Sequence, residues 1–291
     1  MKIAICIQVG TRERFCNLED IINEFIKIYI CDLYIACDHK DVDFFLNLYP
    51  CACVMGTPNI GTDLGKFLYT LKAIQILDKD YDILLKAHTK KPSLWTFDVL
   101  QIFRPAVFNK IQELFENPKI GVVGINPHPA PFSKKDNNIR IIERLMKLYQ
   151  APVKKSMLEL QSSKTYNQIQ SELDLVYYQK HPSNLTLLPK RFLSHYMLFG
   201  LLNNLTTSAQ VTNETDTYKF VCGTIFTGRY SLYKKYLPIE TIDFFLSEIK
   251  AQNERNYVSD LKQDRYTHSL ERLCGGLFAG FEGLDVVGVD F

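Results

Sequence analysis

The sequence predicts an α/β fold in which helices flank a mostly parallel sheet. Short apolar runs alternate with segments of helical periodicity over residues 1–126, which is the pattern of consecutive β-α-β units. Several of these runs end at a glycine or a polar turn, as buried strands do. The chain has 291 residues, of which 46% are hydrophobic, so it has enough apolar material for one large core or two smaller ones.

Strands are expected at the short apolar runs, and helices where apolar residues recur at every third or fourth position. Up to residue 126 the expected strands are 2–9, 32–37, 51–55, 81–87 and 119–125. The expected helices are 17–30, 41–48, 65–77 and 99–115, with Pro105 as a candidate kink in the last.

The middle of the chain, residues 127–216, differs because it is rich in Lys, Asn, Gln and Ser. Helical periodicity at 139–149 and 157–178 favours a helical insertion over a separate domain. Strand character returns at 220–226, helices are expected at 242–254 and 265–274, and a last strand at 285–289. Gly275 and Gly276 are expected to end the second of these helices. Residues 217–291 would then complete the domain that residues 1–126 begin.

Charge and cysteine content argue against some classes of protein. The formal net charge is only +2, so no global basic field predicts a nucleic-acid partner. The eight cysteines show no pairing or zinc-binding pattern, which favours free thiols and a reducing, cytoplasmic compartment. Neither a signal peptide nor a run of about 20 apolar residues is recognisable, so no transmembrane segment is expected.

Four segments carry residue types that suit chemistry. The first, residues 58–65, contains Asn59, Gly61 and Asp63 just before an expected helix. Glycine permits the close approach of a ligand, and a helix N-terminus favours an anion. The spacing matches neither a Walker A loop nor G-x-G-x-x-G, and an ordinary turn with a helix cap explains it at least as well.

The second segment is the apolar run at 81–87, which ends in His88, Thr89, Lys90 and Lys91. Ligands of open α/β sheets bind at the carboxyl ends of the strands. Lysine and histidine there suit an anionic diphosphate, because each cation can form charge-assisted hydrogen bonds with phosphate oxygens. A solvated basic turn is the alternative.

The third segment, residues 220–229, contains Gly223 and Thr224 inside an expected strand. A glycine within a strand often marks the close approach of a ligand or of other backbone. These two residues are therefore candidates for contact with a substrate, and a plain buried strand is the alternative.

The fourth segment begins at Asp264, a residue type that caps helices. Offsets of four and seven residues place Asp264, His268 and Glu271 on one helical face. Such a face could supply a general base and groups that bind an acceptor. A helix cap with a solvated face is the alternative, and no further His, Glu or Cys completes a metal site with His268 and Glu271.

Taken together, the ordered segments resemble the rhamnan-synthesis protein F family of glycosyltransferases. The resemblance covers about residues 56–280 and is interrupted by the helical middle. Its motifs are N-I-G-T-D at 59–63, Y-D followed by K-A-H-T-K-K at 81–91, P-K-I-G-V-V-G at 118–124, C-G-T-I-F at 222–226 and T-H-S-L-E-R-L at 267–273. It implies a GT-A-like fold and the transfer of a sugar, often rhamnose, from a nucleotide-sugar donor to a polysaccharide or surface glycan.

The resemblance also implies roles for individual residues. Asp63, His88 and Lys90 would face the diphosphate and the sugar, with the base and ribose near the first strands. The donor-binding residues implied are Gln8, Thr11, Arg12, Asp38, Asn59, Gly61, Asp63, His88, Thr89, Lys90, Gly223 and Thr224. Asp264 is the first candidate for the base that deprotonates the acceptor hydroxyl, and His268 and Glu271 would bind acceptor or donor sugar.

GT-A enzymes usually hold a divalent metal, Mn or Mg, with an Asp-x-Asp string after the nucleotide-binding helices. Here His88, Thr89 and Lys90 stand at that position, so no metal ligand is predicted and metal dependence stays open. Two rival classes remain. A catalytically silent glycan- or nucleotide-binding module would bind without transfer, and a methyltransferase would bind S-adenosylmethionine, although a Gly-x-Gly-x-Gly-type loop is missing after the first strand.

Overall fold

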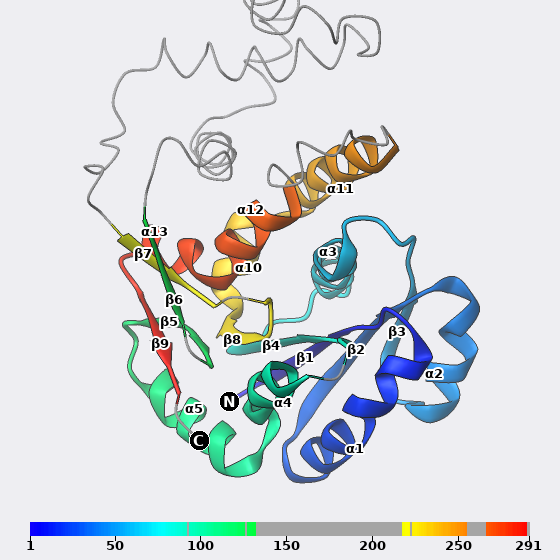
Figure 1. The fold of residues 1–291 in the computed structure, drawn as a ribbon, viewed down its shortest axis with the longest axis horizontal. Coiled ribbons are helices and arrows are strands. Elements are labelled where there is room, and N and C mark those ends of the chain that lie inside the picture. The colour runs from blue at the N-terminus through cyan, green and yellow to red at the C-terminus, as the bar shows by residue number, and fades with distance from the viewer. Residues whose placement is uncertain (92, 126, 132–216, 222, 255–265, 290–291) are drawn as a thin grey trace, which may run out of the picture. The chain divides into compact units, whose positions relative to one another are not determined.

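The computed structural model describes residues 1–91, 93–125, 127–131, 217–221, 223–254 and 266–289. These residues belong to one unit, formed by Met1–Asn138 together with Glu214–Phe291. Its described strands form a seven-stranded sheet in the order β3-β2-β1-β4-β8-β5-β9, with helices on both faces (Figure 1). The predicted α/β class with a mostly parallel sheet is therefore confirmed.

The sheet has a parallel half and a mixed half. The parallel half consists of β1 (Ile3–Gln8), β2 (Cys31–Cys37), β3 (Cys53–Gly56) and β4 (Ile83–His88). In the mixed half, β8 (Phe226–Arg229) runs antiparallel between β4 and β5 (Ile120–Gly124), and β9 (Asp285–Gly288) pairs in parallel with β5. A separate antiparallel pair is formed by β6 (His128–Pro131) and β7 (Thr217–Phe220).

The described helices follow the strands in chain order. The parallel strands are connected by α1 (Arg12–Ile28), the 3-10 turn η1 (His39–Asp41), α2 (Val42–Leu48) and α3 (Thr62–Ile76). Between β4 and β5 lie α4 (Leu94–Leu100), the short turn η2 (Gln101–Phe103) and α5 (Pro105–Glu116). After β8 come α10 (Tyr230–Tyr236), α11 (Ile239–Glu254), α12 (Tyr266–Arg272), the π-helical turn η4 (Leu273–Leu277) and α13 (Phe278–Phe281).

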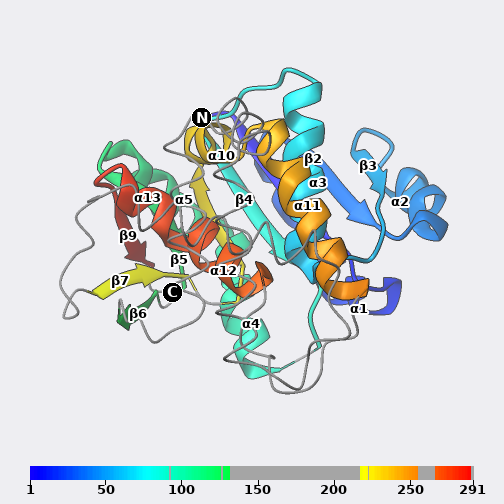
Figure 2. The ribbon, with the colours of Figure 1, turned by 90° about the horizontal axis from the view of Figure 1, so that it is seen from above.

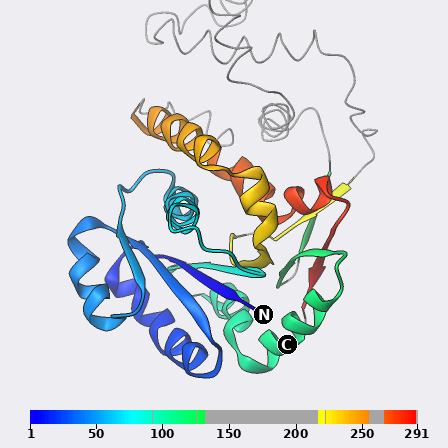
Figure 3. The same cartoon turned by 180° about the vertical axis from the view of Figure 1, so that it is seen from behind.

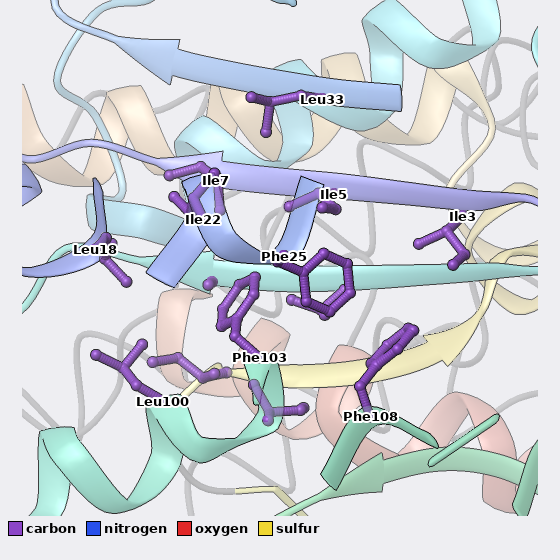
Figure 4. Packing of buried hydrophobic residues seen from close by; sticks show 14 of the residues in the cluster. Ile3, Ile5, Ile7, Leu18, Ile22, Phe25, Leu33, Leu100, Phe103 and Phe108 are labelled. Atoms are coloured by element: carbon purple, nitrogen blue, oxygen red, sulfur yellow. The ribbon is translucent and has the colours of Figure 1, made fainter. Parts of the chain in front are cut away.

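One face of the sheet is a hydrophobic core. Successive residues of a strand point to opposite faces, and on β1 the isoleucines Ile3, Ile5 and Ile7 point to the face that α1, α4 and α5 cover. All three are buried, and Figure 4 shows them near Phe25 of α1 and Phe108 of α5. The rings of Phe25 and Phe108 meet edge to face with centroids 4.6 Å apart, a favoured aromatic geometry.

The opposite face is covered by α3 and the helices that follow β8 (Figures 2 and 3). α3 lies beside α11, and Lys72 of α3 pairs with Asp243 of α11. Phe67 of α3 makes edge contacts with Phe226 of β8 and Tyr233 of α10. Toward the carboxyl ends of β1 and β4 this face changes from apolar to polar.

The chain order creates a topological switch point between β1 and β4. From β1 the chain moves through β2 to β3 in one direction, and α3 then crosses back over the sheet to β4 on the other side of β1. Consequently α1 and α3 lie on opposite faces of the sheet (Figure 1). In open α/β sheets, ligands bind outside the carboxyl ends of the strands at such a point.

Several predicted boundaries are wrong, and three of them have a clear local reason. The first helix begins at Arg12 rather than at residue 17, because the Thr11 hydroxyl accepts a hydrogen bond from the backbone N–H of Arg14 and caps it. Pro105 does not kink a long helix but starts α5, where its missing N–H is not needed. The expected strand 220–226 is interrupted because Gly223 and Thr224 adopt left-handed φ angles of 82° and 61°.

The prediction that Gly275 and Gly276 end a helix is also wrong, because both lie within η4 and α13 follows directly. A Cβ atom on Gly276 would lie 2.1 Å from the Lys219 carbonyl oxygen, so a glycine there permits close contact with the backbone of β7. The Val221 N–H donates to the Gly275 carbonyl at 3.0 Å across the same contact. The predicted helices at 139–149 and 157–178 lie outside the described residues.

Candidate functional site

The candidate site lies at the carboxyl ends of β1 and β4, on the face that α3 covers. Gln8 and His88 are register partners on these strands, so their side chains project from the same face. Gln8 is 1% exposed, and neither polar atom of its amide has a hydrogen-bond partner within the described ranges. The Thr89 hydroxyl accepts a hydrogen bond from the Gly10 N–H at 2.7 Å, which ties together the loops that follow the two strands.

A buried ion pair lies beside these strand ends. Asp63, in the first turn of α3, accepts hydrogen bonds at Oδ2 from Lys86 Nζ at 2.8 Å and from Thr224 Oγ1 at 2.5 Å. Lys86 is fully buried, whereas 18% of the Asp63 side chain is exposed. Because an unpaired buried charge is costly, the pair requires helix, strand and turn to keep this arrangement.

The turn at Gly223 and Thr224 is held from three sides. His88 Nε2 lies 2.9 Å from the Gly223 carbonyl, and Lys86 Nζ donates to the Thr224 carbonyl at 2.8 Å. On the third side, the Gly223 N–H donates to Glu271 Oε1 of α12 at 2.6 Å. Thr224 is β-branched, and its φ of 61° is strained for such a residue. These three contacts keep the Thr224 hydroxyl in one position despite the strain.

A second buried cation organises the neighbouring loops. Lys66 of α3 donates to the Val9 carbonyl at 2.6 Å and to Asp38 Oδ1 at 2.7 Å. The Lys66 side chain is 2% exposed, compared with 31% for Asp38. Lys66 therefore fixes the ends of β1 and β2 and leaves part of the Asp38 carboxylate accessible.

Arg12 links the loop after β1 to the turn after β2. Its Nε donates to Asp41 Oδ1 at 2.6 Å, and its Nη2 donates to the Lys40 carbonyl at 3.1 Å. The guanidinium carbon lies 4.7 Å from the centroid of the Phe44 ring. The buried Asp41 carboxylate thus has a charged partner, and Arg12 remains half exposed.

Electrostatics set the protonation of Asp63 and His88. Burial acts to raise the pKa of Asp63, but the charge of Lys86, with lesser contributions from His88 and two hydrogen bonds, lowers that pKa below its usual range. Burial, together with Lys86 and Lys90, lowers the pKa of His88 to about 4, although Asp63 and the Gly223 carbonyl act in the opposite direction. At neutral pH the site therefore holds a carboxylate, an ammonium group and an uncharged imidazole.

The structure brings many of the predicted site residues together at this edge. Those joined by hydrogen bonds, ion pairs or strand register are Gln8, Asp38, Asp63, His88, Thr89, Gly223, Thr224 and Glu271. The other predicted residues have different places. Thr11 caps α1, Arg12 pairs with Asp41, and Gly61 packs against Ile249. Asn59 is exposed, Lys90 is partly exposed, and His268 belongs to α12. Asp264 lies outside the described residues.

Two charged residues of the site, Lys66 and Lys86, were not predicted from the sequence, although the position of each in its element indicated that it is buried. Lys66 lies three residues after Asp63 and directly before Phe67, on the side of α3 that packs on the sheet. Lys86 occupies an inward position of β4. A lysine on the buried side of an apolar element is expected to have a charged partner. The identity of that partner was not predictable, because it belongs to another element.

The four carboxylates described at this site do not fit a divalent metal, because each already has a partner. Asp63 pairs with Lys86, Asp38 with Lys66 and Asp41 with Arg12, and Glu271 accepts a hydrogen bond from the Gly223 N–H. Across the part of the chain that the structure describes, no group of three or more His, Cys, Asp or Glu side chains is placed to hold a metal ion. A metal would have to displace these partners from its oxygen ligands.

Comparisons of the chain with protein-family models and with curated proteins find no match. None of the helices in the described ranges is both long and apolar enough to cross a membrane. Function is therefore inferred from the residues of the site.

Proposed function

We propose that the chain is a glycosyltransferase with a GT-A-like fold, which moves a sugar from a nucleotide-sugar donor to a polysaccharide or surface glycan. The proposal depends on one observation above all: four separate motif segments meet at one place. Asp63, Lys86 with His88, Gly223 with Thr224, and Glu271 are connected by hydrogen bonds. They meet beside the switch point, where open α/β sheets bind nucleotide ligands, which supports a nucleotide-linked substrate.

In this proposal the donor nucleotide lies over the loops that follow β1 and β2. Asp38 keeps an accessible carboxylate there, and a carboxylate at the end of the second strand can accept hydrogen bonds from ribose hydroxyls. Lys66 holds Asp38 in place. Lys90, which is partly exposed and follows the carboxyl end of β4, is the proposed partner of the diphosphate.

The proposed reaction forms a bond between an acceptor hydroxyl oxygen and the anomeric carbon of the donor sugar. The bond between that carbon and the diphosphate breaks, and the diphosphate keeps the electron pair. Positive charge near the leaving group stabilises the transition state. Asp264 is the proposed base that takes the hydroxyl proton, and rhamnose is the sugar that the resemblance favours.

A thermal-shift panel of UDP-, GDP- and dTDP-linked sugars, each with and without manganese, tests the proposal. A donor present at about 100 times its dissociation constant stabilises the folded state by about 2.7 kcal/mol. We expect stabilisation by one nucleotide family and none by S-adenosylmethionine. If no donor stabilises the folded protein, the proposal is wrong.

The variant Asp264→Asn tests the assignment of the base. We expect it to abolish sugar transfer while the donor still stabilises the fold. Undiminished transfer in this variant would exclude Asp264 as the base.

A catalytically silent glycan- or nucleotide-binding module is the second candidate, and one observation favours it. Every carboxylate at the described edge is already held by a cation or a backbone N–H, so none stands ready as a base. This class predicts donor binding without hydrolysis or transfer. Release of nucleoside diphosphate in the presence of an acceptor distinguishes the two candidates.

A further inference from the structure

We infer that His88 and Gln8 form a subsite for hydroxyl groups of a sugar or a ribose, and that they do not bind the diphosphate. This changes the role that the sequence implied for His88, which was a contact to the diphosphate. The inference rests on the proposed function only where it identifies the ligand as a nucleotide sugar. That the subsite binds hydroxyl groups is argued from the chemistry of the His88 and Gln8 side chains alone.

The hydrogen bonds of His88 determine which ring nitrogen carries the proton. The Gly223 carbonyl can only accept, so His88 Nε2, 2.9 Å away, is the N–H of the ring. The Thr224 hydroxyl also lies 3.1 Å from Nε2, but its proton is donated to Asp63. Nδ1 therefore carries a lone pair, and no residue in the described ranges donates to it. The side chain is 12% exposed, which leaves Nδ1 for solvent or a ligand.

The surroundings keep this ring uncharged. Burial opposes a second proton, and Lys86 from the same strand and Lys90 from the loop after it act in the same direction. Asp63 of α3 lies 3.9 Å from Nε2 and acts against them. Glu271 of α12 is bonded to the Gly223 N–H. A ring that resists protonation is a poor general base and a poor phosphate ligand, but it remains a hydrogen-bond acceptor.

Gln8 supplies the second half of the subsite. Its amide offers one carbonyl acceptor and an NH2 donor, and both are without a partner among the described residues at a position that is 1% exposed. Leaving buried polar atoms unpaired disfavours the folded state, so this position favours a bound group, either a water molecule or a ligand. Because His88 is the more exposed of the two, the ligand contacts His88 directly and Gln8 through an ordered water molecule.

The combination of a neutral acceptor and an amide selects the ligand chemistry. A doubly esterified phosphate group accepts hydrogen bonds but donates none, so it would leave the Nδ1 lone pair without a donor. A hydroxyl both donates and accepts, which matches His88 and Gln8 together. Ring hydroxyls of the donor sugar and hydroxyls of the ribose share this chemistry. A comparison of nucleotide sugars with free nucleoside diphosphates distinguishes the two.

The first experiment is NMR of the full chain with 15N-labelled histidine, in which the His88 signals are identified by their loss in His88→Gln. We expect a protonated Nε2 and an unprotonated Nδ1 from pH 8 to pH 5. A cationic ring near pH 6, or a proton on Nδ1, contradicts the inference without any reference to glycosyl transfer.

The second experiment compares UDP-glucose, GDP-mannose and dTDP-rhamnose with their free nucleoside diphosphates and with inorganic pyrophosphate. We expect His88→Gln, whose amide can still donate to Gly223, to weaken binding of a nucleotide sugar about tenfold. Pyrophosphate binding should not change. The exposed residue Lys27 of α1, on the opposite face of the sheet, provides the control, Lys27→Gln, which should bind all probes normally.

The outcomes show whether the hydroxyl belongs to the sugar or to the ribose, and they test the hydroxyl subsite separately from the glycosyltransferase proposal. Weaker binding of the nucleotide sugar alone assigns the subsite to the sugar, and equal weakening of the nucleoside diphosphate assigns it to the ribose. Loss of pyrophosphate binding in His88→Gln overturns the inference. If no nucleotide sugar binds, the transferase proposal fails, and the NMR experiment is repeated with free rhamnose, glucose and mannose. A shift of the His88 Nδ1 signal with one of these sugars would still support the hydroxyl subsite. No shift with any of them would overturn the subsite as well.

Discussion

The two faces of the sheet differ in what holds them together, although they share the same strands. On the α1 face, Ile3, Ile5 and Ile7 of β1 are buried among apolar side chains. On the α3 face, Lys66 and Lys86 are buried to the same degree but as members of ion pairs.

This difference shows that the interactions that stabilise the fold are not the same as those that position the polar groups of the site. Burial of apolar side chains is the main favourable contribution to folding, whereas a buried ion pair is often no more stabilising than an apolar replacement of the same volume. The apolar core of the α1 face therefore stabilises the fold. The α3 face also buries apolar side chains such as Phe67 and Leu71, but beside the switch point it keeps charged and polar groups in fixed positions, as functional sites commonly do.

The largest expected effect comes from breaking the ion pair on the α3 face. Lys86→Met leaves the Asp63 carboxylate without its cation, and we expect the free energy of unfolding to fall by roughly 3–5 kcal/mol. The double variant Lys86→Met with Asp63→Asn should recover a large part of this loss. Chemical denaturation of the single and the double variant measures the free energy of unfolding of each.

The exposed pair on the outer side of α3 provides the matched control. Lys72 contacts Asp243 at 2.5 Å, but the two side chains are 30% and 50% exposed, compared with 0% for Lys86. Lys72→Met should therefore change stability by about 1 kcal/mol or less. Equal losses for Lys72→Met and Lys86→Met would mean that burial of the pair is unimportant.

The pH dependence of stability should report on His88. Its pKa is lowered from 6.5 in the unfolded chain to about 4 in the fold, so the unfolded state binds a proton first as the pH falls. Stability from this group is thus complete above pH 6.5 and declines by about 3 kcal/mol down to pH 4. Asp63 adds little to this window, because its contribution is lost mainly below pH 4, as the unfolded state begins to bind its proton near the ordinary pKa of 3.8.

Denaturation curves at several pH values for the wild type and His88→Gln measure this decline. We expect it to be smaller in His88→Gln. The same pH slope in His88→Gln and in the wild type would show that His88 titrates normally in the fold.

A substitution on each face of β1 sharpens the comparison further. Gln8→Met removes an unpaired buried amide at similar volume, so we expect the ligand-free protein to gain about 1–3 kcal/mol and the thermal shift with a nucleotide sugar to shrink. Ile5→Val, on the apolar face, should lose about 1 kcal/mol and leave that thermal shift intact. Loss of stability in Gln8→Met would indicate that the amide already has a partner, such as a buried water molecule.

The smallest expected effect concerns backbone strain next to Asp63. Thr62 is exposed and has a φ of 57°, a conformation that glycine adopts without strain. Thr62→Gly should raise stability by up to about 1 kcal/mol, because the relief of strain exceeds the entropy that glycine loses on folding. The Thr62 hydroxyl donates only an exposed, 3.2 Å hydrogen bond to Asp63 Oδ1, so its removal costs little. Thr224→Gly, at a similar φ of 61°, should not raise stability, because it removes the part-buried hydroxyl that donates to Asp63 Oδ2 at 2.5 Å. The melting temperatures of both variants test this contrast.

Local patterns in the sequence predicted a good part of the fold. Apolar runs located β1, β2 and β4 closely, and polar residues after the apolar run at 81–87 indicated the edge of the sheet where the site lies. Patterns failed where one residue changed the backbone: Thr11 extended α1 by a cap, and left-handed angles at Gly223 and Thr224 interrupted an expected strand. Caps and left-handed residues act over three or four positions, which is too short a range to alter periodicity.

The sequence by itself determined the α/β class, the alternation along β1 and the presence of polar residues where β4 ends. Only the tertiary structure decided that Asp63 meets Lys86 and Thr224, that Asp38 meets Lys66, and which nitrogen of His88 carries the proton. The reason is the range of the forces involved. Periodicity reflects neighbours along the chain, whereas hydrogen bonds and ion pairs join residues such as Asp63 and Thr224, which lie 161 positions apart and come together only when the sheet is complete.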